Sequence, residues 1–218
     1  RSEGKLQAGE YSLRKNLNMV QLASLLVTGE ALSSEKVIKI IEGWTSVDIA
    51  EYLSDSAFLE AVAASDSRSI LPDKAYEFLA DKSSDQGLEG YLFPDTYRVY
   101  KDASSAHIIE RMLDNFDMKL TQELRAEIKS QGKTIFDVVI LASIVEKEVR
   151  AKQDKKIAAG IFLNRLDIGK PLESDATVNY VTGKNVLQAS QEDVETESPY
   201  NTYLNKGLPP GPICNPGL

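Results

Sequence analysis

The sequence predicts an α+β fold, in which a small α/β unit precedes a mainly helical part with some strand. Residues 36–41 read KVIKII, an alternating to apolar run typical of a strand, and a turn at 42–45 leads into the amphipathic helical pattern of 47–53. Further along, several segments between residues 105 and 168 carry apolar side chains at helical spacing. With 218 residues, 42% of them hydrophobic, the chain can form a core and fits one domain or two small ones.

Short helices are expected throughout the first part of the chain. VQLASLL at 20–26 shares the pattern V-x-[LI]-A-x-x-L with the helix at 47–53. SAFLEAVAA at 56–64 and DKAYEFLADK at 73–82 continue the helical spacing. We group these helices with the strand at 36–41 into a first unit.

A domain boundary is expected where the composition becomes aromatic, so that residues 1–86 form the first unit and 87–218 the second. The second unit opens with GLEGYLFPDTYRVY at 87–100, which reads as strand or irregular structure. Two well-marked helices follow at 105–120 and 122–130.

The end of the chain has a different character from its middle. A helix at 152–168 carries Ile157, Ile161 and Leu166 on one side and ends at Gly169. After it, apolar residues no longer recur at helical spacing. The final GLPPGPICNPGL consists almost entirely of residues typical of turns. Because a natural domain seldom ends in this way, we expect the C-terminal part of the fold to be missing from this chain.

Composition excludes several classes of protein. A formal net charge of −8 without a basic block argues against nucleic-acid binding, and the longest apolar stretch is too short to span a bilayer. The single Cys214 excludes an internal disulfide, and the single His107 excludes two-histidine metal motifs. There is no phosphate-binding glycine loop and no EF-hand loop, so neither a metal nor another cofactor is expected. Acid–base chemistry therefore falls to carboxylates.

One helix has the pattern that such chemistry needs. It begins at a capping box formed by Thr134 and Asp137, and residues 135–145 are apolar almost all round, which is typical of a buried helix. Glu146, Lys147 and Glu148 follow at the C-terminal end of this helix. Both glutamates continue apolar rows of the helix, so periodicity does not choose between them.

A carboxyl group held against apolar walls has a raised pKa and can keep a proton to donate, which is the property of a general acid. Two other readings compete with this one. The glutamates can simply surface at the end of the helix, or one of them can form an ordinary ion pair with Lys147, Arg150 or Lys152. Spacing alone favours these two readings.

Ordered motifs then resemble a known family. ASIVEKE at 142–148 is followed by IFLNRL, PLESDATVNY, SPYNTY and GLPPGPICNPG. LQAGEYSL, IEGWTSVDIAEYL and EGYLFPDTY precede it, so the resemblance covers most of the chain. Together they resemble the MltG (YceG-like) family of endolytic murein transglycosylases.

The resemblance implies a bacterial enzyme on the extracytoplasmic face of the plasma membrane, anchored by one N-terminal helix that lies before Arg1. Residues 1–86 would hold a LysM-like subdomain, and 87–218 the catalytic domain, which continues in the family beyond this chain. The implied partners are peptidoglycan glycan strands and cell-wall synthases. The implied reaction cleaves the MurNAc-β-1,4-GlcNAc bond without water, leaves a 1,6-anhydroMurNAc end, and terminates or releases nascent strands.

The resemblance also assigns residues. Glu146, the first glutamate of EKE, would be the catalytic acid and base, since one carboxyl can make both proton transfers when the sugar attacks itself. Tyr200, Asn201 and Tyr203 resemble a Tyr-Asn signature near the active site of other transglycosylases. Sugar contacts are also expected from three residues that follow Glu146 along the chain, namely Asn164, Glu173 and Asp175.

Two other functions remain open. A non-catalytic peptidoglycan-binding or scaffold protein of the cell-wall machinery would use the LysM-like part and keep Glu146 for structure. A hydrolase would pair Glu146 with a second carboxylate such as Asp175 to activate water.

Overall fold

The structure, a computed structural model, describes residues 18–28, 35–64, 66–184 and 186–217. LQAGEYSL at 6–13 therefore lies outside the described residues. The fold is mixed, as expected for α+β, with helices and a two-stranded sheet β1-β2. The elements follow in chain order: α1 Met19–Thr28, β1 Glu35–Lys39, α2 Ser46–Leu53, α3 Ser56–Ala63, η1 Ser67–Ser69, η2 Glu77–Leu79, β2 Thr96–Tyr100, α4 Ser105–Lys119, α5 Gln122–Ser130, α6 Ile135–Glu148, α7 Lys152–Asp167, α8 Asp175–Thr182 and α9 Gln191–Val194.

The described residues group into two compact units. The first runs to Ile38 and includes 96–104, so that it holds α1 and nearly all of the sheet. The second comprises 39–95 and 105–218 and holds the remaining helices. The division into residues 1–86 and 87–218, and the LysM-like nature of the first part, stay predictions. Among the described residues, no helix combines the length and apolar character needed to cross a membrane.

Most of the expected helices are present, because their ends carry the right capping residues. Thr45 caps α2 and Thr134 caps α6, each in a capping box with the aspartate three positions later, and Thr121 caps α5. In α6 the reciprocal bonds run from the Asp137 N–H to Thr134 Oγ1 at 3.0 Å and from the Thr134 N–H to Asp137 Oδ2 at 3.2 Å. These bonds satisfy backbone donors that the first turn leaves free.

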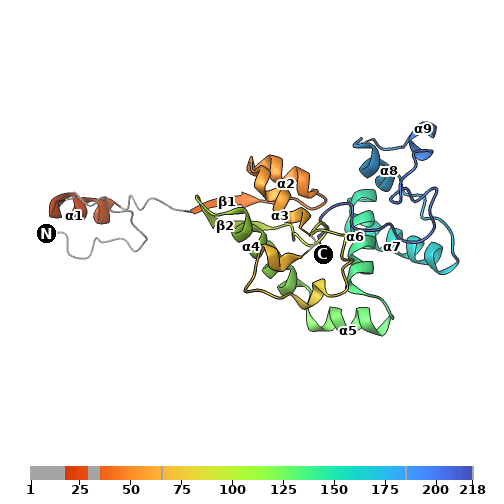
Figure 1. Ribbon diagram of the computed structural model, residues 1–218, viewed down its shortest axis with the longest axis horizontal. Coiled ribbons are helices and arrows are strands. Elements are labelled where there is room, and N and C mark those ends of the chain that lie inside the picture. The colour runs from red at the N-terminus through yellow and green to blue at the C-terminus, as the bar shows by residue number, and fades with distance from the viewer. Residues whose placement is uncertain (1–17, 29–34, 65, 185, 218) are drawn as a thin grey trace. The chain divides into compact units, whose positions relative to one another are not determined.

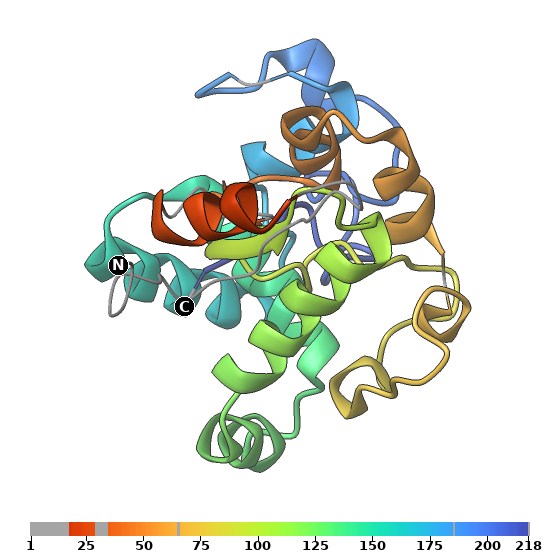
Figure 2. The ribbon, with the colours of Figure 1, turned by 90° about the vertical axis from the view of Figure 1, so that its left-hand side faces the viewer.

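The buried helix α6 lies in the middle of the second unit and organises it (Figure 1). It packs against α5, α7, α8 and η2. Its side chains Ile140, Ile144 and Val145 form a core with partners from four other segments, namely Phe162, Leu172, Ala176 and Ile213. Figure 2 shows α4 leading into α5 at the lower edge of the same unit. A second group of rings joins η2 to α4, with Phe78, Tyr91 and Phe116 within 5.7 Å of one another.

Two expectations about individual elements were wrong. Residues 73–82 form only the short 3₁₀ helix η2, in which Phe78 is buried against the aromatic group. The side of α7 that faces the core holds Phe162, Ala158 and Leu166, whereas Ile157 and Ile161 are 64% and 52% exposed. Alanines at the contact let α7 approach α6 closely, which fixes the face that is buried.

The region after α7, where the helical signal fades, is more ordered than expected. It contains α8 and α9, and residues 211–216 of the turn-rich segment are all buried. Gly90, at a φ of 88°, explains how the segment fits: a Cβ there would lie 2.6 Å from Pro212 and 2.8 Å from Val139. Glycine lets the backbone adopt this angle and lets the segment pass. We call residues 211–217 the docked segment.

Candidate active site

Ser143, the polar break in α6, is where the docked segment attaches to the helix. Its hydroxyl donates to Ile140 O at 2.7 Å and accepts the Ile213 N–H at 3.0 Å. The Cys214 thiol donates to Ser143 O at 3.3 Å. Burial raises the pKa of this thiol, which is fully enclosed. The serine therefore satisfies a backbone donor that would otherwise be buried without a partner.

Glu146 comes at the end of α6, next to this segment, and its side chain is only 9% exposed. The Lys155 ammonium donates to both carboxylate oxygens, at 2.7 Å to Oε1 and 2.8 Å to Oε2. The Gly217 N–H donates to Oε2 at 3.1 Å. The carboxylate is thus enclosed by donors, in a position that α6, α7 and the docked segment fix together.

The expectation of apolar walls around Glu146 was therefore only half right. The side chain is buried, but an ammonium group faces it, because the first turn of α7 folds back over the end of α6. The partner is Lys155 rather than one of the three expected cations, Lys147, Arg150 and Lys152. Lys147 instead donates to Gly43 O at 3.1 Å. The Glu146 carboxyl group therefore faces a cation as well as a backbone donor.

A turn from the first part of the chain completes the surroundings of Glu146. Gly43, at a φ of 81°, brings the backbone so close that a Cβ there would lie 3.6 Å from Glu146 Cγ. Glu42 Oε2 is 3.8 Å from the Lys155 ammonium, and the Glu42 side chain lies against Gly217. Two carboxylates therefore share one ammonium.

A buried network holds that turn in place. Asn215 donates from Nδ2 to Trp44 O at 3.0 Å and to Glu89 Oε1 at 2.7 Å, and its Oδ1 accepts the N–H groups of Gly90 and Leu92. Glu89 Oε2 also accepts the N–H and the hydroxyl of Ser46. Burial raises the pKa of Glu89, because these neutral donors do not replace the water that the charged form loses. The carboxyl with the raised pKa is Glu89, a residue that sequence reasoning did not single out.

Glu148, the other glutamate that periodicity allowed, faces a different helix. Its Oε1 accepts from the Ser174 hydroxyl and from the Ala176 N–H at 3.5 Å. Ser174 is the N-cap residue of α8, where backbone N–H groups point out of the helix. The contacts of Glu148 therefore support a role in joining α6 to α8.

The other predicted site residues lie in two groups. Around the start of α8, the Tyr203 hydroxyl donates to Asp175 Oδ1 at 3.0 Å, and burial followed by this bond raises the pKa of Tyr203 to about 12. The exposed Glu173 forms an ion pair with Arg165 at 2.7 Å. Asn164 lies exposed on α7.

The second group lies around Asn201. Its Nδ2 donates to Val194 O and Thr196 O, and the side chain is fully buried, so its contacts hold the loop after α9. Tyr200 packs its ring 5.0 Å from that of Tyr180 and donates to Gln86 Oε1 at 3.1 Å. The Trp44 ring lies 5.3 Å from that of Tyr52.

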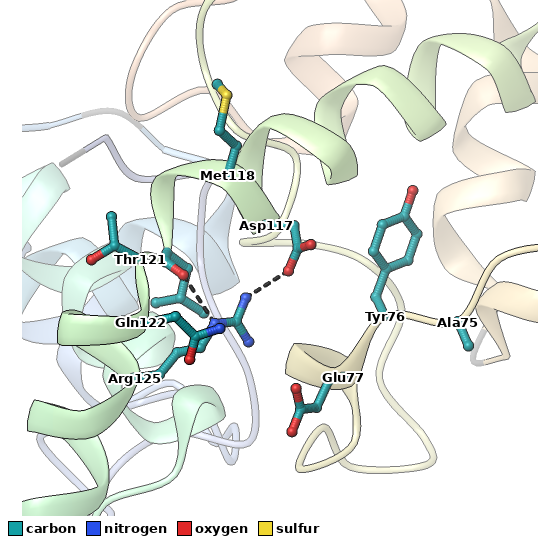
Figure 3. A pocket seen from close by; sticks show the side chains of 9 residues that line it. Ala75, Tyr76, Glu77, Asp117, Met118, Thr121, Gln122 and Arg125 are labelled. Atoms are coloured by element: carbon teal, nitrogen blue, oxygen red, sulfur yellow. Dashed lines mark hydrogen bonds and ion pairs between the residues drawn. The ribbon is translucent and has the colours of Figure 1, made fainter.

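A separate cavity of about 390 Å³ lies between η2 and the junction of α4 and α5 (Figure 3). Arg125 points into it and donates to Asp117 Oδ1 at 2.6 Å and to Leu120 O at 2.9 Å. None of the predicted site residues lines this cavity. In the described ranges, no three His, Cys, Asp or Glu side chains are grouped so that they could hold a metal ion.

Comparisons with known proteins match the chain over nearly its whole length. The YceG-like family model matches residues 1–218. The chain belongs to the YceG-like family. A relative in Bacillus subtilis (strain 168), named endolytic murein transglycosylase, is 32% identical over 223 residues. A protein of the same name in Streptococcus pneumoniae D39 is 32% identical over 238 residues. A YceG-like protein from Listeria monocytogenes, solved by crystallography, superposes with a TM-score of 0.71 at 32% identity.

The chain spans only part of these family members. It is covered to 97% by the Bacillus match and to 98% by the Streptococcus match, but spans 61% and 43% of those two proteins. Of the Listeria protein it spans 73%.

Several residues of this YceG-like site were missed by sequence reasoning. Glu89 and Asn215 lie in motifs that carried the family resemblance, EGYLFPDTY and ICNPG, so the motifs gave a signal that periodicity did not. Glu42 also lies in such a motif, IEGWTSVDIAEYL, whereas Lys155 had no such signal. Lys155 is one of several lysines in the first half of a polar helix, and only the turn between α6 and α7 brings it to Glu146.

Proposed function

We propose that this chain carries the catalytic centre of an endolytic lytic transglycosylase, a carbon–oxygen lyase that acts on peptidoglycan. The observation that carries the proposal is Glu146, a nearly buried carboxylate enclosed by Lys155 and by the Gly217 N–H. Membership of the YceG-like family and the printed names of its relatives support the same activity.

A single carboxyl is sufficient for this reaction. Glu146 protonates the oxygen that links MurNAc to GlcNAc, and the C1–O bond breaks with its electron pair on that oxygen. The resulting carboxylate then takes the proton from the C6 hydroxyl as that oxygen bonds to C1, which gives the 1,6-anhydroMurNAc end. A glycosidase that uses water needs a second carboxylate. The candidate for that role, Asp175, accepts a hydrogen bond from the Tyr203 hydroxyl.

Sugar contacts are assigned by exposure and hydrogen-bonding capacity. Tyr200, Tyr203 and Asp175 are half-buried and offer hydroxyl and carboxylate groups, and Asn164 and Glu173 are exposed. Asn201 contributes to sugar binding indirectly, because its hydrogen bonds hold the loop that carries Tyr200 and Tyr203. An extracytoplasmic, membrane-anchored protein that meets nascent glycan strands and cell-wall synthases fits this activity, with a LysM-like part in residues 1–86.

A scaffold role is the second candidate, and one observation favours it. Both oxygens of Glu146 are occupied, as they would be in a purely structural ion pair. A scaffold protein would bind glycan strands and make no new ends.

Glu146→Gln in the full-length protein tests the proposal against both alternatives. We expect it to abolish the release of anhydro ends from purified peptidoglycan, as followed by mass spectrometry, because an amide cannot donate and recover the proton. Glu148→Gln is the matched control and should keep most of the activity, since a glutamine oxygen can still accept from Ser174 and Ala176.

The products separate the outcomes. Unchanged anhydro ends from Glu146→Gln would reject Glu146 as the acid. Reducing ends, which are one water heavier, would indicate a hydrolase. Glycan binding without new ends in the unsubstituted protein would indicate a scaffold.

A further inference from the structure

The ammonium group of Lys155 lies between two carboxylates of unequal exposure. It donates to both oxygens of Glu146, at 2.7 and 2.8 Å, and is 3.8 Å from Glu42 Oε2. The side chains of Glu146 and Lys155 are 9% and 19% exposed, whereas that of Glu42 is 56% exposed. One cation, Lys155, therefore lies between two carboxylates.

The turn that holds Glu42 is attached without Lys155. Gly43 N donates to Asn215 O at 2.9 Å, Asn215 N donates to Trp44 O at 2.8 Å, and Lys147 donates to Gly43 O. A buried ion pair is a weak source of stability, because both ions lose water on folding. The cost of burying Lys155 against Glu146 is therefore not explained by the need to hold this turn.

The contacts instead match the charge that develops in the reaction. When Glu146 gives up its proton, the anion appears on the two oxygens that Lys155 faces, and the Gly217 N–H faces one of them. Donors that are already in place at developing charge stabilise a transition state without reorganisation. While Glu146 carries its proton, the ammonium needs another anion, and Glu42 is within reach.

We propose that Lys155 is a second catalytic residue, which stabilises the Glu146 anion as it forms, and that Glu42 is a positioning residue that holds the ammonium while Glu146 is protonated. The inference rests on the proposed function. No further reactant is needed: the proton moves from Glu146 to the leaving oxygen and is replaced from the C6 hydroxyl, while Lys155 keeps all its protons and changes only its carboxylate partner.

Four variants of the full-length protein test the proposal, with kcat, KM and melting temperature measured for each. Lys155→Met should lower kcat roughly a hundredfold, the scale on which a preorganised donor acts, while KM stays within about threefold. Lys155→Arg should recover part of kcat, because it keeps the charge with a different shape. Glu42→Gln should lower kcat less than Lys155→Met does. Lys156→Met, at the exposed neighbouring position, should match the unsubstituted protein.

The pH profile gives a readout that a structural role would not move. Lys155 pairs with Glu146, Glu42 lies 3.8 Å from the Lys155 ammonium, and the Lys147 side chain lies beside Gly43, as Glu146 does. Lys155→Met removes the cation that faces the Glu146 carboxyl group, so the pH profile of its kcat should differ from that of the unsubstituted protein. Lys156→Met should leave the profile in place.

The outcomes are separable from those for the proposed function. If Glu146→Gln is inactive but Lys155→Met keeps its kcat and pH profile, Lys155 is not catalytic and the transglycosylase proposal stands. If Lys155→Met loses activity only in proportion to its folded fraction, the residue is structural and the inference is overturned. If Glu146→Gln is active, the proposed function fails and the role of Lys155 fails with it.

Discussion

Two carboxyl groups of the site, Glu146 and Glu89, show how strongly the partners of a side chain decide its chemistry. Glu146 faces an ammonium group, whereas Glu89 accepts from the neutral donors of Ser46 and Asn215. The sequence predicted a buried carboxyl at 146 or 148, because apolar rows of α6 run into both, and only the family resemblance chose Glu146. It did not identify either set of partners, since they come from segments far away in the chain.

Glu89 makes a testable contribution to stability. Its pKa is raised by burial, so the folded protein holds this proton to higher pH than the unfolded chain does. The contribution of Glu89 to the free energy of unfolding should therefore fall as pH rises above the ordinary carboxyl value of 4.5. Glu89→Gln removes that fall, although it loses the hydrogen bond from Asn215 at a cost of about 1 kcal/mol.

Urea unfolding of the unsubstituted protein and of Glu89→Gln, over a range of pH above 4.5, checks the direction of this pH dependence. The free-energy difference, unsubstituted protein minus Glu89→Gln, should decrease with pH. Two parallel curves would show that the ionisation of Glu89 is not linked to folding.

Helices could be predicted from the sequence where local signals such as capping residues determine them. They could not be predicted where packing against distant segments determines them. The capping residues Thr45, Thr121 and Thr134 mark helix starts that the structure has at the expected positions. The buried face of α7 and the short η2 depend instead on contacts with distant segments. The α8 sequence DATVNYVT has β-branched and polar residues of low helix propensity, and its burial against α6 supplies what propensity lacks.

The cap of α6 should matter more than that of α5. Thr134→Ala breaks a capping box on a buried helix and should lower the free energy of unfolding by about 1 kcal/mol. Thr121→Ala is the matched control: α5 has no fully buried side chain among its described residues, so losing its cap should mainly fray that helix. Equal losses for the two variants in urea unfolding would contradict this ranking.

At the scale of the whole molecule, the site is assembled from segments that the sequence keeps far apart. The turn at Gly43, the Glu89 region, the end of α6 and the docked segment meet around Glu146. Each lies in one of the motifs that carried the family resemblance, so the motifs predicted which segments matter. They did not predict that the turn, placed in the first of two expected domains, packs directly on the end of α6.

Asn215 joins these segments by its hydrogen bonds. The reactivity of the neighbouring Cys214 can show whether they stay joined. Asn215→Ala leaves the Gly90 and Leu92 N–H groups without their buried acceptor and should lower the free energy of unfolding by roughly 2–4 kcal/mol. The buried Cys214 should then react faster with a thiol reagent under native conditions. Asn164→Ala, at an exposed position, should label at the unsubstituted rate. Equal labelling of the two variants would show that Asn215 does not hold the docked segment.

The hydrogen bond from Gly217 to Glu146 bears on when the protein can work during its synthesis. A ribosome adds residue 146 long before residue 217, so for most of translation the helix that carries the glutamate exists without one of its donors. Residues 211–217 have to be made and to pack beside Gly90 before Glu146 has all the donors that enclose it. Glu146 therefore gains its backbone donor only after the chain has been extended as far as Gly217.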